Sequence, residues 1–212
     1  MSKPDQGQGP APLSDGGISP RVERALRWAA ILHSGQTRKA SEIPYFAHVA
    51  AVAMIVERAG LGEDAVIAAL LHDVVEDTDA TLPQVEQRFG PVVAATVAAC
   101  SETKHDAEGR QRPWIDRKRD HLRAMAGLDL AARAVMLADK LHNLVSIELD
   151  LDEGRPVWRA FNAGRDQVLW YHRAVIDACD DEADPRLRSL AQAARAALDR
   201  VETRGPDSTE SS

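Results

Sequence analysis

The sequence predicts an all-α fold, a single helical bundle formed by one domain. Alanine, leucine, valine and arginine dominate its 212 residues, and aromatic residues make up only 4%. Such a composition favours helices, and no alternating apolar and polar run of useful length predicts a strand. With 44% hydrophobic and 28% charged residues, the chain suits one compact domain with tails.

The predicted helices can be placed by their start and stop signals. Pro20 opens the first helix, which ends at His33 before a Ser-Gly break. Gly60 ends the second, over about residues 45–59. The third covers residues 63–77, and Thr81 caps a short helix to Phe89. The remaining predicted helices span residues 91–100, 114–126, 130–144, 157–180 and 185–203.

The two ends of the chain differ from its centre. Residues 1–19 are rich in Gly, Pro, Ser, Gln and Asp, which predicts a disordered leader. Residues 204–212 predict a disordered polar tail, so the domain occupies residues 20–203. No secretory signal and no run of about 20 apolar residues is present. Cys100 and Cys179 have no metal-binding or redox spacing, so we expect a cytoplasmic protein without membrane contact.

Composition also bears on the partners of the chain. The formal net charge of −7 gives no support to nucleic-acid binding. A local basic pocket for an anionic small molecule is compatible with that charge. A homodimer is also possible, through apolar helix faces.

A histidine–aspartate pair at the end of an apolar run is the strongest signal for a site. His72 and Asp73 follow Ala-Leu-Leu, and the acids Glu76 and Asp77 come shortly after them. On one continuous helix, His72 would lie over Glu76 and Asp73 over Asp77. Ionisable groups in such a place are costly unless a metal or an opposite charge compensates them. The pattern therefore predicts a metal site with two acids beside it.

Two further candidate ligands come from other predicted helices. Taken alone, His48 is more often an ordinary helix histidine, and Asp139 could simply pair with Lys140 or Arg133. Taken together, the residues form a mixed set of nitrogen and oxygen ligands that suits Mn, Fe, Co or Zn better than Ca. The predicted ligands are His48, His72, Asp73 and Asp139. Water bound to such a metal could act as a nucleophile.

The order of these ligands carries a resemblance. His48, His72-Asp73 and Asp139 resemble the H…HD…D signature of the HD phosphohydrolase superfamily. That resemblance implies an all-α HD domain, with these residues as the metal ligands for hydrolysis of phosphoesters or phosphoanhydrides. Longer motifs at residues 33–39, 72–78 and 138–144 resemble the RelA/SpoT-type hydrolase domains over about residues 20–180. In size the chain resembles the small stand-alone members of that branch, which include the metazoan SpoT homologue.

This closer resemblance implies an activity and a set of site residues. The activity is removal of the 3′-pyrophosphate from the guanosine alarmones ppGpp and pppGpp, usually with Mn²⁺. Glu76 and Asp77 would orient or deprotonate the attacking water, although an acidic helix end is the plainer interpretation. The residues expected to contact the nucleotide are Arg38, Lys39, Lys118, Arg119, Asn143, Ser146 and Tyr171.

The chemistry of these side chains agrees with such contacts, but plainer interpretations exist. Arg38 can stack on a purine and Lys39 can meet a phosphate, or both are solvated loop charges. Lys118 and Arg119 could reach the pyrophosphate, or they form a charged helix face. Tyr171 could approach the nucleotide, or it belongs to the core.

The chain departs from the alarmone hydrolases at positions expected to choose the substrate. Ala40 stands where a serine often follows the Arg-Lys pair, and Val145 stands where many members carry arginine. Hydrolysis of another nucleotide, of NADPH or of an adenine alarmone therefore remains an alternative on the same fold. A non-catalytic nucleotide sensor is a further alternative, although the pair Glu76 and Asp77 argues against it. A helical interaction module without a site is the last.

Overall fold

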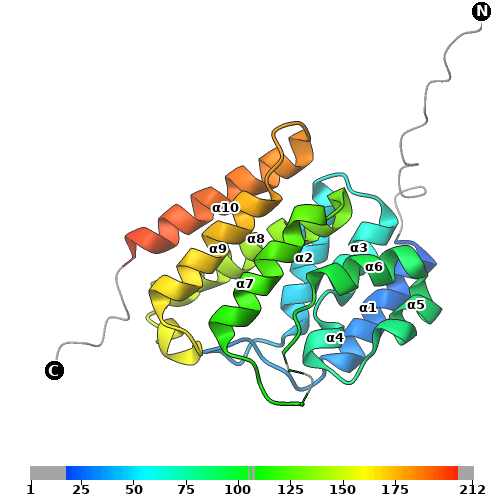
Figure 1. Ribbon diagram of the computed structural model, residues 1–212, viewed down its shortest axis with the longest axis horizontal. Coiled ribbons are helices and arrows are strands. Elements are labelled where there is room, and N and C mark those ends of the chain that lie inside the picture. Colours follow the sequence, from blue (N-terminus) through cyan, green and yellow to red (C-terminus); the bar gives the residue numbers. More distant parts are fainter. Residues whose placement is uncertain (1–17, 105, 107, 205–212) are drawn as a thin grey trace, which may run out of the picture.

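The structure is a computed structural model that describes residues 18–104, 106 and 108–204. In these residues the chain is helical without a named strand, and a single bridge joins Thr37 to Pro44. The predicted all-α fold is confirmed (Figure 1). Apart from residues 18, 19 and 204, the predicted leader and tail lie outside the described residues. No helix in the described ranges is both long and apolar enough to cross a membrane.

The elements follow one another with short connections, except for the two long loops before α2 and before α7. In chain order they are α1 (Pro20–Leu32), α2 (Phe46–Arg58), α3 (Glu63–Leu71), α4 (Val74–Asp77), α5 (Leu82–Phe89), α6 (Pro91–Cys100), α7 (Trp114–Ala124), the 3₁₀ turn η2 (Met125–Gly127), α8 (Leu130–Asp152), the 3₁₀ turn η3 (Val157–Ala160), α9 (Arg165–Cys179) and α10 (Pro185–Thr203).

Local sequence signals set several helix starts. The Ser19 side chain accepts a hydrogen bond from the Val22 amide and caps α1. Thr81 and Gln84 form the capping box that begins α5. The Asp129 carboxylate accepts from a backbone amide in the first turn of α8. Each cap satisfies an amide that would otherwise lack a partner at the start of its helix.

Two helices, α3 and α8, form the centre of the bundle next to the site. The residues of α3 from Ala65 to Leu71 are all buried, in contact with α1, α2, α6 and α8. The long helix α8 packs against α10, α2, α9 and α6 (Figure 1). Full burial of a leucine such as Leu70 or Leu137 contributes about 1.5–3 kcal/mol. The site residues on α8 and directly after α3 are therefore held by buried, well-packed helices.

Three predicted helix boundaries are wrong. The helix predicted over residues 63–77 breaks after Leu71, and α4 starts at Val74, so His72 is not stacked on Glu76 along one continuous helix. Successive residues of a helix point about 100° apart, whereas this break lets His72 and the next residue face the same point. The helix α8 runs eight residues beyond the predicted end at 144, and the helix predicted over 157–180 is divided into η3 and α9.

Candidate active site

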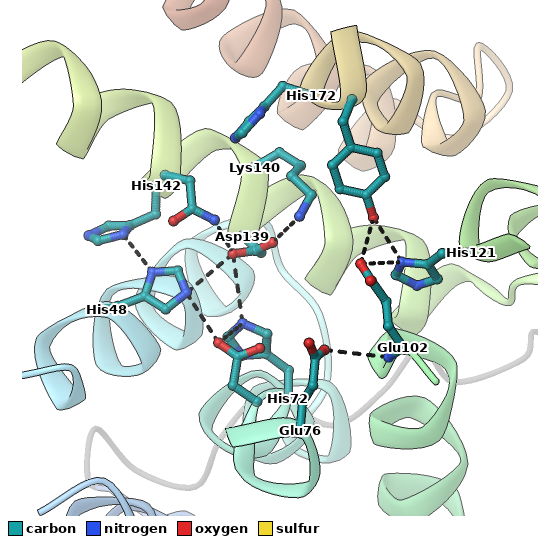
Figure 2. A network of polar contacts seen from close by, with 12 residues as sticks. His48, His72, Glu76, Glu102, His121, Asp139, Lys140, His142 and His172 are labelled. Carbon is teal, nitrogen blue, oxygen red and sulfur yellow. Dashed lines mark hydrogen bonds and ion pairs between the residues drawn. The ribbon is translucent and has the colours of Figure 1, made fainter. Parts of the chain in front are cut away.

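The predicted metal ligands meet from three parts of the fold (Figure 2). His48 comes from α2, Asp139 from α8, and His72-Asp73 from the turn between α3 and α4. The Nε2 atom of His48 lies 3.2 Å from Asp139 Oδ1 and 3.6 Å from Asp73 Oδ2. The Nε2 atom of His72 lies 3.2 Å from Asp73 Oδ2 and 3.8 Å from Asp139 Oδ1. His48, His72 and Asp139 form a compact group able to hold an ion, and one oxygen of Asp73 borders it.

The histidine hydrogen bonds suit a metal. His72 Nδ1 lies 2.8 Å from the carbonyl oxygen of Ala69, so this nitrogen carries the proton and donates it. The Nε2 atom then presents its lone pair to the centre of the group. It is buried and has no hydrogen-bond partner in the described residues. A buried nitrogen in this state, facing two carboxylates, fits a divalent cation.

The electrostatics of the group point the same way. Burial alone would lower the pKa of His72, but the negative charges of Asp73 and Asp139 raise it to about 9. The two carboxylates therefore create a strong local preference for positive charge. A divalent cation satisfies that preference and leaves both histidines neutral, as metal ligation requires.

Further side chains hold the carboxylate ligands in place. The hydroxyl of Tyr45 donates to Asp73 Oδ2 at 2.6 Å. The ammonium group of Lys140 donates to Asp139 Oδ2 at 2.6 Å, and the Asn143 amide donates to the other oxygen. Each carboxylate thus has a fixed orientation, which is typical of residues that surround a metal ligand.

The two acids beside the metal group are held by a lysine. Lys104 Nζ lies 3.3 Å from Glu76 Oε1 and 2.7 Å from Asp77 Oδ1, and it also donates to the Glu76 carbonyl oxygen. Burial, followed by the charge of Asp73, raises the pKa of Glu76 above its ordinary value. A carboxylate with a raised pKa next to a metal is suited to accept a proton from water.

A cavity of about 720 Å³ opens over the metal group. Its size lies in the range of small-molecule sites. The predicted contacts that line it are Arg38, Lys39, Lys118, Asn143, Ser146 and Tyr171. Arg119 does not line it, because this side chain is exposed on the other face of α7. Neither Ala40 nor Val145 lines the cavity. These two positions, where the chain differs from the alarmone hydrolases, were expected to affect the choice of substrate, but they lie outside the cavity wall.

Cations cluster in this cavity although the whole chain is acidic. Lys39 lies with its ammonium group 4.7 Å from the centre of the Phe161 ring. Much of Lys39 is open to water, yet the cavity walls surround it. Partial desolvation, followed by the charges of Lys118 and Arg38, lowers its pKa. Mutual repulsion of this kind is relieved when an anion binds among the cations.

The wall beside α7 contains a buried carboxylate with several donors. Glu102 pairs with Lys118 and lies 3.4 Å from Arg117 and 3.4 Å from His121. The hydroxyl of Tyr171 donates to it at 3.3 Å. Tyr171 is mostly buried, and only part of its surface lines the cavity. Its position therefore combines the two interpretations of the sequence, a core residue and a contact of the nucleotide.

The sequence interpretation missed several residues of the site. Tyr45 stands three residues before His48 and so lies about one turn away, a spacing that could have identified it. Trp114 is partly buried and His121 is buried. Their spacing on α7 places Arg117 and Lys118 on the same inward face of the helix and Arg119 on the outer face. No sequence signal identified Lys104, because it lies in an irregular loop.

Comparison with known proteins identifies the family to which this fold and site are similar. The model of the HD domain family matches residues 25–166. The chain is 36% identical over 162 residues to the Drosophila melanogaster protein named guanosine-3′,5′-bis(diphosphate) 3′-pyrophosphohydrolase MESH1, covering 75% of the chain and 84% of that protein. It is 39% identical over 180 residues to the Mus musculus protein of the same name, covering 82% and 95%.

Two further relatives agree. A solved structure of a metazoan ortholog of SpoT that hydrolyses ppGpp matches with a TM-score of 0.70 at 30% identity, covering 90% of this chain and 99% of that one. The bifunctional (p)ppGpp synthase/hydrolase SpoT of Escherichia coli is 38% identical over 125 residues, which are 58% of this chain but 18% of that protein. From its helical architecture, its ligand group and these similarities, the chain belongs to the HD domain family.

Proposed function

We propose that this protein is a metal-dependent pyrophosphohydrolase that removes the 3′-pyrophosphate from ppGpp and pppGpp. The observation that carries the proposal is the junction of three features in one cavity: the ligand group, the paired acids Glu76 and Asp77, and the cation cluster. A phosphorylated substrate, a metal and a water-activating carboxylate are the components of phosphoanhydride hydrolysis. The fly and mouse relatives carry the name of this activity.

The ligand group would be His48, His72, Asp73 and Asp139. When bound there, a divalent cation supplies Lewis acidity and lowers the pKa of water. The mixed nitrogen and oxygen donors support Mn²⁺, with Fe, Co and Zn as chemically similar alternatives.

The paired acids do the proton chemistry in this proposal. Glu76 accepts a proton from the attacking water, since its raised pKa brings it closer to neutral pH. Asp77 orients that water, and Lys104 keeps the two carboxylates together. The water oxygen forms a bond to the phosphorus next to the 3′ oxygen, and the bond from this phosphorus to the 3′ oxygen breaks. The 3′ oxygen takes up a proton and leaves as the nucleotide 3′ hydroxyl, and the two phosphoryl groups leave as pyrophosphate that carries the water oxygen.

The cavity walls would bind the rest of the nucleotide. Lys39 and Lys118 meet phosphate oxygens, and Tyr171 supports the ammonium group of Lys118, which lies 4.3 Å from the centre of its ring. Arg38 offers its guanidinium plane to the base, and Asn143 and Ser146 offer hydrogen bonds. Arg119 is exposed, and Arg117 takes its place in the cavity wall.

The proposal includes the setting of the enzyme. Two buried cysteines without a disulfide support a reducing cytoplasm. The net charge of −7 supports a small-molecule substrate rather than a nucleic acid. Exposed apolar side chains such as Met54 and Leu149 support a homodimer.

The first experiment is pyrophosphate release from ppGpp by the purified protein, with Mn²⁺ and with chelator. The proposal expects release that depends on Mn²⁺. Replacing Asp73 with Ala should abolish both metal binding and turnover. Asp79→Ala is the matched control, because Asp79 is exposed and does not line the cavity. An Asp73→Ala protein that keeps its metal and its full rate would refute the site, and a metal-loaded wild type inactive on ppGpp would refute the substrate.

A further inference from the structure

The long helix α8 turns one continuous face toward the cavity. Residues at positions 139, 143, 146, 147 and 150 all line it, and their spacing of three or four residues is that of a single helix face. From Asp139 to Asp150 the helix rises roughly 16 Å. A nucleotide that places its 3′ phosphates at Asp139 can therefore extend along this face toward Asp150.

The two parts of the cavity differ in chemistry. Lys104, Arg117 and Lys118 line the wall formed by α7 and the loop before it. The later turns of α8 and the segment after it contribute the apolar side chains of Ile147 and Phe161, with the Lys39 ammonium group at the edge of this part, on the Phe161 ring. Phosphates favour the cationic wall, whereas a flat base favours the apolar one.

Asp150 stands at the end of the apolar part. This residue is only 8% exposed, and its side chain borders the cavity. It lies in the last turn of α8, where the helix dipole disfavours negative charge, and Asp152 and Glu153 follow it. A buried carboxylate in this position is costly and requires donors.

The protein supplies only some of the hydrogen bonds that the Asp150 carboxylate can accept. Arg155 Nη1 donates to Asp150 Oδ1 at 3.1 Å. Among the described residues, no hydrogen bond to the other carboxylate oxygen is found. Burial raises the pKa of Asp150, and the charges of Arg155 and Arg38 act against that rise. Arg38 in turn donates to Asn143 at 2.7 Å, so the residue proposed to stack on the base lies between Asp139 and Asp150 along α8.

We propose that Asp150 determines base specificity by accepting hydrogen bonds from the N1–H and 2-amino groups of guanine. This inference rests on the proposed function for the placement of the phosphates. Guanine presents these two donors side by side, which matches the two oxygens of a carboxylate. Adenine presents an unprotonated ring nitrogen beside its amino group, so the carboxylate would face a lone pair. A site built around a buried carboxylate therefore selects guanine and rejects adenine.

The test measures binding apart from turnover. Dissociation constants of the guanosine, inosine and adenosine 3′,5′-bis(diphosphates) are measured by calorimetry on chelator-treated wild type and on Asp150→Asn, which preserves the side-chain shape. The control is Asp152→Asn, an exposed carboxylate in the same turn that pairs with Arg204. Thermal melting checks that each variant is folded.

The expected result is a change confined to guanine recognition. Asp150→Asn should weaken guanosine binding about 10- to 100-fold, the range for a hydrogen bond to a charged group, while adenosine binding stays the same or improves. The inosine compound, which lacks the 2-amino group, should fall between the other two on wild type, and Asp152→Asn should match wild type.

Other outcomes separate this inference from the proposed function. Equal weakening of all three nucleotides, or none, would overturn the role of Asp150 even if Mn²⁺-dependent pyrophosphate release is observed. Wild type that prefers the adenosine compound, or binds none of the three, would overturn it as well. Guanine selectivity that depends on Asp150, without pyrophosphate release from any of the three, would support the role of Asp150 and refute the proposed hydrolase.

Discussion

The Nδ1 atom of His48 lies 2.8 Å from the Nδ1 atom of His142 (Figure 2). One of these nitrogens donates and the other accepts. For His48 to offer its Nε2 lone pair to a metal, its Nδ1 must carry the proton. The Nδ1 atom of His142 must then accept this hydrogen bond, which requires that its own ring is neutral. Burial and the neighbouring charge of His48 lower the pKa of His142 to about 4, which keeps this ring neutral at physiological pH.

Replacing His142 with Ala should therefore weaken metal binding. We expect a loss of about 10- to 100-fold in affinity, as is usual when the hydrogen-bond partner of a metal-ligating histidine is removed. A calorimetric titration of the apoprotein with Mn²⁺ measures this change. His142→Asn, which can still accept a hydrogen bond, should retain more affinity than the alanine variant. Equal affinity of wild type and both variants would show that the imidazole pair does not orient His48.

Tyr45 provides a test on the other side of the metal group. Its hydroxyl donates to Asp73 Oδ2 at 2.6 Å, and burial, followed by the charge of Asp73, raises the pKa of this phenol above its ordinary value. Tyr45→Phe removes only the hydroxyl, so the helix and the ring packing should remain. We expect metal affinity to fall about 10-fold with a small change in melting temperature.

The matched control for Tyr45 is Trp170→Phe, a change at an exposed aromatic residue outside the cavity wall. Calorimetry with Mn²⁺ compares the two variants under identical conditions. A Tyr45→Phe protein with the affinity of the control would mean that Asp73 is held by other contacts.

Lys104 is expected to affect rate rather than metal content. Its ammonium group joins Glu76 and Asp77, the two residues proposed to handle the attacking water. Lys104→Met keeps most of the side-chain volume but releases both carboxylates. A displacement of about 1 Å can cost about 10²-fold in rate, so we expect kcat to fall about 10- to 100-fold. Atomic absorption should show an unchanged Mn content.

The control for Lys104 is Arg110→Met in the same loop, whose exposed side chain pairs with Asp106 and Glu108. It should leave kcat unchanged. If Lys104→Met instead raises KM alone, the lysine binds substrate and does not position the acids.

The sequence predicted the centre of the site better than its walls, for a physical reason. His72, Asp73 and Asp139 each follow an apolar run, and a charged group placed in a buried segment is visible as a pattern. The break in the helix after Leu71 carries no such mark, because no proline or glycine stands there. The tightly packed turn is set by tertiary contacts, which override helix propensity.

The walls depended on contacts between segments far apart in the chain. Glu102 meets Tyr171 across 69 positions, and Arg38 meets Asn143 across 105. Single-residue chemistry suggested Arg38 and Lys118 but could not exclude Arg119, which follows in the same charged run. Only the burial of Trp114 and His121 fixes the rotation of α7. A sequence pattern describes one helix at a time, whereas a cavity wall is formed by segments that are far apart in the chain.

The buried carboxylate of Glu102 should make stability depend on pH. Burial alone would raise the pKa of Glu102, but a hydrogen bond from His121 and the charge of Lys118 outweigh it and lower the pKa to about 2. Lys118 itself loses more from burial than it gains from Glu102, so its own pKa is lowered. A carboxyl with a depressed folded pKa stabilises the fold above its unfolded pKa of 4.5. This stabilisation is lost as the pH falls toward 2.

Replacing Glu102 with Gln should lower the free energy of unfolding by about 3 kcal/mol at pH 7. The difference between wild type and variant should shrink as the pH falls from about 4.5 toward 2, because protonation of Glu102 removes the same charge. Urea unfolding at several pH values measures this difference. Glu86→Gln, an exposed substitution on α5, should show none. A difference that stays constant from pH 7 to pH 3 would mean that the ionised carboxylate does not stabilise this wall, and that Glu102 acts there through its shape and neutral hydrogen bonds.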